Sequence, residues 1–336
     1  MPRQVVVSCS RLRSSLPFAL ALFLGLAALP PGAWANAQPF GEWLQGVRAE
    51  ALRRGMKPAT VERALVGVQP IPRVIELDRK QPEFTMTMRE YIAKVVNQTR
   101  VDLGRQALAD NRAVLVPIGQ KYGVQPRFIV ALWGIETNYG STTGNFSVIA
   151  ALVTLAYDGR RSKYFREELM DALKILDQGH IAPGEMRGSW AGAMGQNQFM
   201  PSSFLRFAVD EDGDGRKNIW TSRTDVFASI ANYLKGVGWR DDQTWGRPVR
   251  LPASFDESLA DGKTKRAIDA WAALGIRSAD GAALPQRAGL VAGIVSPEGR
   301  DGPSFMVYDN FNHIMRWNRS TYFATAVGLL ADRLAR

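Results

Sequence analysis

Sulfur and imidazole side chains are scarce in this sequence of 336 residues, which contains one cysteine and two histidines. Cys9 lies in an amino-terminal segment that we expect to be removed, so the mature chain would have no disulfide, no thiolate metal site and no cysteine nucleophile. His180 and His313 are too few for a histidine-rich metal site, and we expect both to be structural. The sequence also lacks a phosphate-binding glycine loop and a nucleophile elbow. These absences argue against thiol, P-loop and serine-hydrolase chemistry.

The amino terminus has the pattern of a secretory signal. Three arginines precede a mostly apolar run at residues 16–29, and Ala33-Trp-Ala35 forms an A-x-A cleavage site. The run is short for a bilayer-spanning helix. We therefore predict export and removal of residues 1–35, with a retained anchor as the alternative. Cys9 precedes the apolar run, so we expect no lipid-anchored cysteine.

The net charge is +10, and it becomes +7 when the three signal arginines are removed, because residues 1–35 contain no acid. This excess suits an anionic polymer such as nucleic acid, lipid headgroups or an acidic cell-wall glycan. No basic run is long enough to indicate nucleic acid, which an exported protein rarely meets. A solvated, soluble surface is the alternative interpretation.

One acidic residue occupies an unexpected place in an apolar segment. Residues 128–140 have the spacing of a short amphipathic helix in which Ile129, Leu132 and Glu136 share the buried stripe. Burial favours a neutral carboxyl, and so does the negative end of the helix dipole, where we expect Gly140 as the cap. A general acid must hold such a proton. Glu136 is therefore a candidate catalytic acid; a glutamate that snorkels or pairs with an arginine is the alternative.

The spacing of apolar residues predicts a mainly helical chain with a β-containing part. We expect a turn at 78–82, one long helix at 85–110, and strands at 249–251, 289–292 and 305–308 with a helix at 266–274 among them. Ser320 is the expected cap of a closing helix at 320–336. The other helices are expected at residues 114–122, 148–156, 164–178 and 224–236.

Two loops carry polar groups suited to binding. Gly192–Ser203 combines small residues with neutral donors and acceptors, including Gln196 and Gln198, that match sugar hydroxyls and amides; a polar loop that caps a helix is the alternative. Asp210-Glu-Asp-Gly-Asp-Gly-Arg216 meets the front half of a calcium-loop pattern. Asp225 is the first acid able to close that loop, and a solvated acidic turn is the alternative.

An ordinary glycosidase requires a second carboxylate opposite its acid. The nearest candidate, Asp158, lies beside Arg160 and Arg161 in the sequence, which predicts an ion pair rather than a catalytic base. The sequence thus offers one acid without its usual partner.

Five ordered motifs resemble those of the B-type lytic murein transglycosylases of Gram-negative bacteria. They are Glu136-Thr-Asn-Tyr-Gly140, Gly192-Ala-Met-Gly-x-x-Gln-Phe-Met-Pro-Ser-Ser203, the Asp210 loop ending in Ile219-Trp220, Ala231-Asn-Tyr-Leu234, and Arg316-Trp-Asn-Arg-Ser320. The resemblance covers nearly all of the mature chain, from about residue 40. It implies a mainly α (α+β) fold with a lysozyme-like catalytic core at 111–238, a helical domain at 36–110, a small β-containing domain at 239–312, and a carboxyl-terminal helix at 313–336 that packs on the helical domain.

The resemblance also implies an activity: cleavage of the β-1,4 bond between N-acetylmuramic acid and N-acetylglucosamine without water, in the periplasm. Glu136 matches the family's catalytic position, where one glutamate protonates the leaving oxygen and then acts as base on the muramic C6 hydroxyl. The product carries a 1,6-anhydro ring, so no cofactor and no second carboxylate are needed. Positions that match substrate contacts are Ser189, Gln198, Tyr233, Asn318, Arg160, Arg161 and Tyr139. Positions that match the calcium loop are Asp210, Asp212, Asp214, Asp225 and the Arg216 carbonyl.

The sequence departs from the family pattern at three places. Asn197 stands where a smaller residue is expected, Trp317 replaces a tyrosine, and the closing acid of the metal loop comes one residue late. The resemblance is compatible with an association with cell-wall synthases, and we expect a monomer whose partner is the peptidoglycan glycan strand. A hydrolytic muramidase and a catalytically silent peptidoglycan-binding scaffold are the alternatives.

Overall fold

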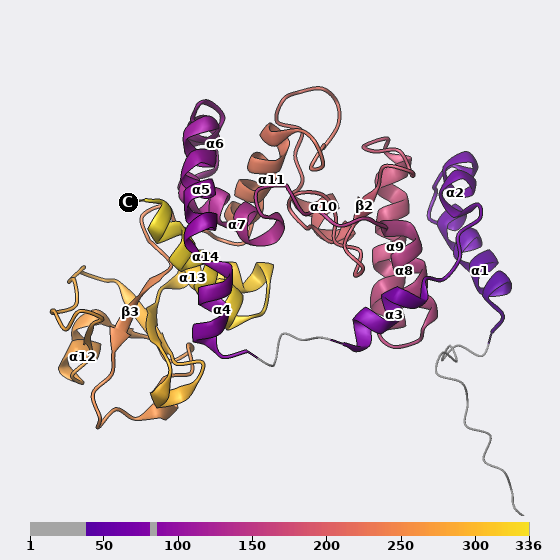
Figure 1. Ribbon diagram of the computed structural model, residues 1–336. Helices are drawn as coiled ribbons and strands as arrows, with labels where there is room; N and C mark the ends of the chain where they lie inside the picture. The colour runs from indigo at the N-terminus through magenta and orange to yellow at the C-terminus, as the bar shows by residue number, and fades with distance from the viewer. Residues whose placement is uncertain (1–37, 81–85, 336) are drawn as a thin grey trace, which may run out of the picture. The chain divides into compact units, whose positions relative to one another are not determined.

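The computed structural model describes residues 38–80 and 86–335 (Figure 1). The predicted signal peptide, residues 1–35, lies outside these ranges, as does part of the turn predicted at 78–82. Within them, no helix combines the length and the apolar character needed to cross a membrane. The described chain is mainly helical and carries one small antiparallel sheet and a two-stranded ribbon. The predicted fold class is confirmed.

Three helices open the described chain, and two of them begin with proline. They are α1 (Phe40–Arg53), α2 (Pro58–Leu65) and α3 (Pro72–Arg79). Proline suits the first helical position because its missing N–H has no partner there in any case. Asp78 and Arg79 are the last residues of α3, so the turn predicted at 78–82 is wrong for them. Asp78 is buried and bonded to arginines, which sequence spacing could not show.

The long helix predicted at 85–110 is two helices, α4 (Met88–Val95) and α5 (Gln98–Asp110). Thr87 and Glu90 form a capping box at the start of α4. Asn97 caps α5, because its side chain accepts a hydrogen bond from the Arg100 N–H at 2.9 Å. An asparagine side chain that bonds to the backbone competes with the hydrogen bonds of a continuous helix. The chain therefore ends α4 at Val95 and begins α5 at Gln98.

The central helices lie close to the predicted ranges, except the helix at residues 201–207, for which no range was predicted. They are α6 (Arg112–Tyr122), α7 (Pro126–Thr137), α8 (Val148–Tyr157), α9 (Ser162–Asp177), α10 (Pro201–Phe207) and α11 (Arg223–Gly236). Helices α8 and α9 pack side by side (Figure 1). Gly123 ends α6 in the left-handed region with φ 68°, as glycine at this cap position allows.

A five-stranded antiparallel sheet has the order β4-β6-β7-β3-β5. Its strands are β3 (Gly246–Arg250), β4 (Arg266–Ala267), β5 (Arg277–Ser278), β6 (Val291–Val295) and β7 (Ser304–Val307). The three predicted strands are confirmed with shifted ends, and the helix predicted at 266–274 is the shorter α12 (Ile268–Ala273). Residues of this part form a hydrophobic core of their own around Trp271, Ile294 and Met306.

The chain closes with two helices, α13 (Asp309–Trp317) and α14 (Thr321–Leu334). Helix α14 and its cap were predicted, and the Ser320 hydroxyl does accept a hydrogen bond from the Phe323 N–H at 3.2 Å. The single carboxyl-terminal helix expected at 313–336 is wrong, because the chain leaves the helical conformation at 318–320 and a separate helix, α13, precedes α14. Helix α14 packs against α4, α5, α7 and α13, so its apolar stripe belongs to the main hydrophobic core.

Candidate active site

Helix α7 brings Glu136 to the site. Residues 128–134 of this helix are buried on every side, so the predicted amphipathic pattern is wrong: α7 is a core helix that packs against α5, α6, α11 and α14. Glu136 is half-buried, one residue before the helix ends. The Glu136 carboxyl therefore lies at the edge of the hydrophobic core, where α7 ends.

The carboxyl end of α7 is closed by Asn138 rather than by the predicted Gly140. Asn138, Tyr139 and Gly140 have φ values of 48°, 59° and 82°. Asparagine tolerates the left-handed region better than most residues, and its backbone N–H donates to the Gly134 carbonyl at 3.0 Å. The helix therefore ends two residues earlier than we predicted, which places Glu136 in its last turn.

Tyr139 is held between two helical glycines. A Cβ atom added to Gly134 of α7 would lie 2.5 Å from the tyrosine ring, and one added to Gly104 of α5 would lie 2.4 Å from its hydroxyl oxygen. The hydroxyl donates to the Arg100 carbonyl at 2.7 Å. Burial raises the pKa of the Tyr139 hydroxyl. Tyr139, a predicted substrate contact, thus ties the end of α7 to α5.

Gln196 joins the polar loop to α7. Its side-chain oxygen accepts from the Trp133 indole at 2.9 Å, and its side-chain nitrogen donates to the Trp220 carbonyl at 2.8 Å. Its own carbonyl accepts from the Thr137 hydroxyl at 3.0 Å. Both ends of the amide are therefore used within the protein, although the sequence suggested that Gln196 could face a sugar.

The loop that carries Ser189 and Gln198 is shaped by short backbone pairings. Strand β1 (Phe146–Ser147) pairs with β2 (Arg187–Gly188), and isolated bridges join Met194 to Gly188 and to Phe199. The Ser189 hydroxyl accepts from the Ala193 N–H at 3.1 Å. Gln198 has a φ of 50° and donates to the Thr143 and Gly195 carbonyls at 3.0 and 2.9 Å.

Asn197, the first departure from the family pattern, is fully buried in the same loop. Its side-chain nitrogen donates to the Val226 carbonyl of α11 at 3.2 Å. Its side-chain oxygen is a buried acceptor without a hydrogen bond among the described residues. The larger residue is thus accommodated by packing the loop on α11.

An aromatic cluster of Phe199, Phe207, Tyr233 and Trp317 lies beside Glu136. The Trp317 and Tyr233 ring centroids are 4.6 Å apart, and the Trp317 and Phe199 centroids are 5.1 Å apart. The Trp317 indole N–H donates to Glu136 Oε1 at 2.7 Å. The Tyr233 hydroxyl donates to the Arg316 carbonyl at 2.7 Å, so this predicted substrate contact holds the last turn of α13. Asn318 caps α13 and is exposed.

Arg160 and Arg161 both bind the buried Asp78. Arg160 approaches this carboxylate at 2.6 Å, and Arg161 bonds its other oxygen. The ion pair expected for Asp158 exists, but its partner is Arg79 at 3.2 Å, because Arg160 and Arg161 turn towards Asp78. About half of each arginine side chain stays exposed, at 53% and 46%. Both guanidinium groups therefore keep donor surface facing solvent.

The acidic loop gathers the predicted metal ligands. One carboxylate oxygen from each of Asp210, Asp212 and Asp214 lies within 4.8 Å of the others. Hard oxygen donors at such spacing fit calcium better than a transition metal. Asp210 also orders the loop, since its two oxygens accept from the Gly213 and Gly215 N–H groups, each at 2.8 Å.

Asp225 lies fully buried beneath this loop at the start of α11. Its carboxylate accepts from the backbone N–H groups of Glu211 at 2.8 Å and Asn218 at 2.7 Å. Burial raises the pKa of Asp225, although these N–H groups favour its charged form. His180 supports the same loop, because its Nδ1 accepts from the Lys217 N–H at 3.2 Å. Burial lowers the pKa of His180, in keeping with this acceptor role.

The sequence pattern of the family described as "Transglycosylase SLT domain" matches residues 39–332. The chain belongs to this family. It is also 37% identical over 222 residues to the membrane-bound lytic murein transglycosylase B of Escherichia coli strain K12. That alignment covers 64% of this chain and 58% of the relative, so less than two thirds of the relative's length is matched.

Solved structures of family members superpose on most of the chain. SltB3 from Pseudomonas aeruginosa in complex with NAG-anhNAM-pentapeptide has a TM-score of 0.86 and 44% identity, over 89% of this chain and 80% of that one. SltB1 from the same organism has a TM-score of 0.78 and 30% identity, over 88% and 98%. Escherichia coli Slt35 in complex with calcium has a TM-score of 0.74 and 30% identity, over 87% and 92%. The resemblance to B-type lytic transglycosylases is confirmed.

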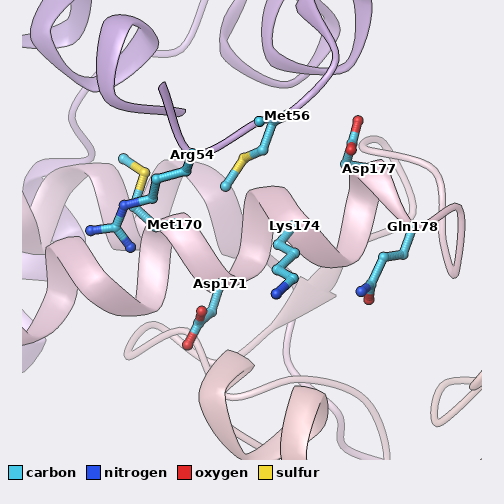
Figure 2. A pocket seen from close by; sticks show the side chains of 8 residues that line it. Arg54, Met56, Met170, Asp171, Lys174, Asp177 and Gln178 are labelled. Atoms are coloured by element: carbon cyan, nitrogen blue, oxygen red, sulfur yellow. The ribbon is translucent and has the colours of Figure 1, made fainter. Parts of the chain in front are cut away.

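A pocket of about 310 Å³ lies elsewhere on this transglycosylase-family chain (Figure 2). Arg54 and Met56, between α1 and α2, face Met170 and Lys174 of α9 across it. Arg54 is bound by Glu167 at 2.9 Å. None of the predicted site residues lines this pocket, so the pocket is not part of the predicted catalytic or substrate-binding site.

Sequence reasoning missed the link between Trp317 and Glu136. It noted Trp317 as a departure from the family, but 181 positions separate the two residues and α13 itself was not predicted. A usable signal for α13 existed: Phe311 and Ile314 have helical spacing, Asp309 suits the first turn and Arg316 the last. No sequence signal places the indole against the carboxyl.

We predict that Gln196→Glu lowers the free energy of unfolding by about 2 kcal/mol. The substitution keeps the side-chain shape but replaces the donor to the Trp220 carbonyl with an acceptor. Urea unfolding measures the effect. Gln45→Glu, on the exposed face of α1, is the matched control and should change stability by less than about 0.5 kcal/mol. Equal effects at both positions would show that Gln196 does not join the loop to α7.

Proposed function

We propose that this protein is a periplasmic lytic transglycosylase that cleaves the bond between N-acetylmuramic acid and N-acetylglucosamine in peptidoglycan without water. The observation that carries the proposal is Glu136, placed at the end of a buried helix and hydrogen-bonded at 2.7 Å by Trp317. The named activity of the Escherichia coli relative and the anhydro-sugar ligand of SltB3 support it. The signal predicted at residues 1–35 supports the location.

In the first step, Glu136 donates its proton to the glycosidic oxygen. The bond between that oxygen and C1 of the muramic acid breaks, and positive charge develops on the sugar ring. Glu136 is half-buried and follows the buried residues 128–134 of α7. The acetamido group of the substrate itself can stabilise the positive charge.

In the second step, the Glu136 carboxylate takes the proton of the muramic C6 hydroxyl as the C6 oxygen bonds to C1. The product is a 1,6-anhydro ring, and Glu136 returns to its protonated form without consuming water. The C6 oxygen is already held near C1 by the sugar, so proximity replaces an activated water. Asp158, the candidate second carboxylate, is 3% exposed and paired with Arg79, which supports a one-carboxylate route.

We propose that Ser189, Gln198 and Asn318 line the sugar cleft on either side of Glu136. The pairing of β1 with β2 holds the loop that carries Ser189 and Gln198. The aromatic cluster holds the end of α13, where Asn318 lies. Arg160 and Arg161 remain candidates for contacts with peptide or glycan, because their exposed donor surface can meet carboxylates. Tyr233 and Tyr139 act in this proposal by fixing the elements around the cleft.

We propose a structural calcium ion in the acidic loop and no cofactor for catalysis. Asp210, Asp212 and Asp214 would supply carboxylate oxygens, and the Arg216 carbonyl and Asp225 complete the proposed ligand set. Calcium would offset the repulsion among carboxylates packed this closely. The calcium complex of Slt35 supports this assignment.

Glu136→Gln tests the catalytic proposal through its products. Wild-type protein acting on purified sacculi should release muropeptides one water lighter than hydrolysis products, without a reducing end. Glu136→Gln should release them at least about a hundredfold more slowly, because the amide can neither donate nor accept the proton. Mass spectrometry of the soluble fraction measures both.

Glu42→Gln, an exposed glutamate on α1, is the matched control and should keep wild-type activity. Reducing ends formed by the wild type would identify a muramidase instead. Sacculus binding with no release by the wild type would identify a binding scaffold. Full activity of Glu136→Gln would contradict the assigned role of this residue.

Calcium at about one hundred times its dissociation constant should raise the free energy of unfolding by about 2.7 kcal/mol over the chelated protein. Thermal unfolding with calcium and with chelator measures the difference. Asp212→Asn and Asp214→Asn should lose the response, whereas Asp241→Asn, an exposed acid outside the loop, should retain it. A melting temperature that calcium leaves unchanged in the wild type would rule out the site.

A further inference from the structure

The indole of Trp317 contacts one oxygen of the Glu136 carboxyl. Its Nε1–H donates to Oε1 at 2.7 Å, although the two residues lie on different helices and 181 positions apart. This distance is at the short end of the range for N–H···O hydrogen bonds, where bonds to carboxylate acceptors are found. Trp317 is half-buried, at the end of α13.

The surroundings fix this indole in place. Tyr233 packs against it edge to face with an interplanar angle of 62°, and Phe199 packs against it at 53°. The Tyr233 hydroxyl holds the carbonyl of the preceding residue, Arg316, at 2.7 Å. Tyr233 lies on α11 and Phe199 in the polar loop, so two separate elements set the position of the donor. Such packing pre-organises the hydrogen bond before a substrate arrives.

The direction of this hydrogen bond can be assigned from chemistry alone. An indole N–H donates and cannot accept, whereas a tyrosine hydroxyl, expected here from the family resemblance, can do either. Oε1 must therefore offer a lone pair to Trp317 in both protonation states of the carboxyl. In a neutral carboxyl the carbonyl oxygen is a better acceptor than the hydroxyl oxygen, so this bond favours Oε1 as the carbonyl oxygen and Oε2 as the oxygen that carries the transferable proton.

We propose that Trp317 is a positioning residue that orients the Glu136 carboxyl so that Oε2 gives the proton to the glycosidic oxygen and later takes one from the C6 hydroxyl. The inference rests on the proposed function of Glu136 as acid and base. The same donor stabilises the carboxylate formed after the first transfer, because a hydrogen bond to a charged acceptor is stronger than one to a neutral acceptor. Both effects lower the barrier of the first step.

Two other titratable groups, Tyr233 and His313, lie on the helices that position the indole. Burial raises the pKa of the Tyr233 hydroxyl, against the opposing effect of Arg206 and Arg316. Burial lowers the pKa of His313 on α13, helped by Arg316. Tyr233 therefore stays neutral to higher pH than an exposed tyrosine. The pKa of His313 is lower than that of an exposed histidine.

The test is the pH profile of kcat/KM for wild type, Trp317→Phe and Trp317→Tyr. Trp317→Phe removes the donor that favours the carboxylate, so Glu136 should keep its proton to higher pH and the alkaline limb should move up by about one pH unit. The rate at the optimum should fall at least about tenfold. Trp317→Tyr supplies a hydroxyl donor and should restore part of the rate and of the wild-type profile.

Two controls separate positioning from packing. Trp239→Phe removes another buried indole, whose N–H donates to Gln125 at 3.0 Å, and should lower stability without moving the profile. Replacing Trp317 by benzothienylalanine keeps the ring shape but has sulfur in place of the N–H, and should move the profile as Trp317→Phe does. This second variant decides the question even if Trp317→Phe does not fold.

A benzothienylalanine variant with the wild-type rate and profile would overturn the inference and leave the proposed function standing, provided that Glu136→Gln remains inactive. Wild-type activity in Glu136→Gln would instead remove the proposed function, whatever the behaviour of Trp317. A rate loss in the isostere without a shift of the alkaline limb would also overturn the orientation argument.

Discussion

The burial of helix α7 is the constraint on which the site depends. Seven consecutive residues of this helix are buried, so its neighbours must cover every side, and its last turn must satisfy its carbonyl groups without continuing the helix. Asn138 turns the chain in the left-handed region, and Thr137 and Trp133 bond to Gln196 of the polar loop. The residue left at the margin of this buried helix is Glu136. The environment of Glu136 is therefore set by the position at which the buried part of α7 stops.

The groups around Glu136 come from distant parts of the chain, and each is held by contacts outside the reacting atoms. The polar loop is folded by β1, β2 and the bridges of Met194. Helix α13 is fixed by the Tyr233 hydroxyl, which brings Trp317 to the carboxyl. The acidic loop is ordered from below by the buried Asp225. The elements that bear the proposed chemistry are thus supported by backbone bonds and aromatic packing, and Gln196 and Trp317 link them to one another.

Local patterns predicted much of this structure, because helical periodicity and caps are properties of short segments. The helices near 148–156 and 224–236 and the Ser320 cap are examples. The break at Asn97 was missed because an asparagine side chain can compete with the helix it interrupts. The pairing of Arg160 and Arg161 with Asp78, and of Trp317 with Glu136, depends on tertiary structure. The family motifs indicated Glu136. They could not indicate that Trp317, which stands where the family has a tyrosine, would contact this carboxyl.

The central claim is that one carboxyl, presented by α7 and oriented by Trp317, acts with a nucleophile inside the substrate. The most direct measurement is the digestion of purified sacculi in water enriched in oxygen-18, followed by mass spectrometry of the released muropeptides. The account predicts that the new muramic acid ends contain no oxygen-18, because the C6 oxygen of the same sugar closes the ring. Incorporation of one oxygen-18 atom at C1 of each new end would contradict it.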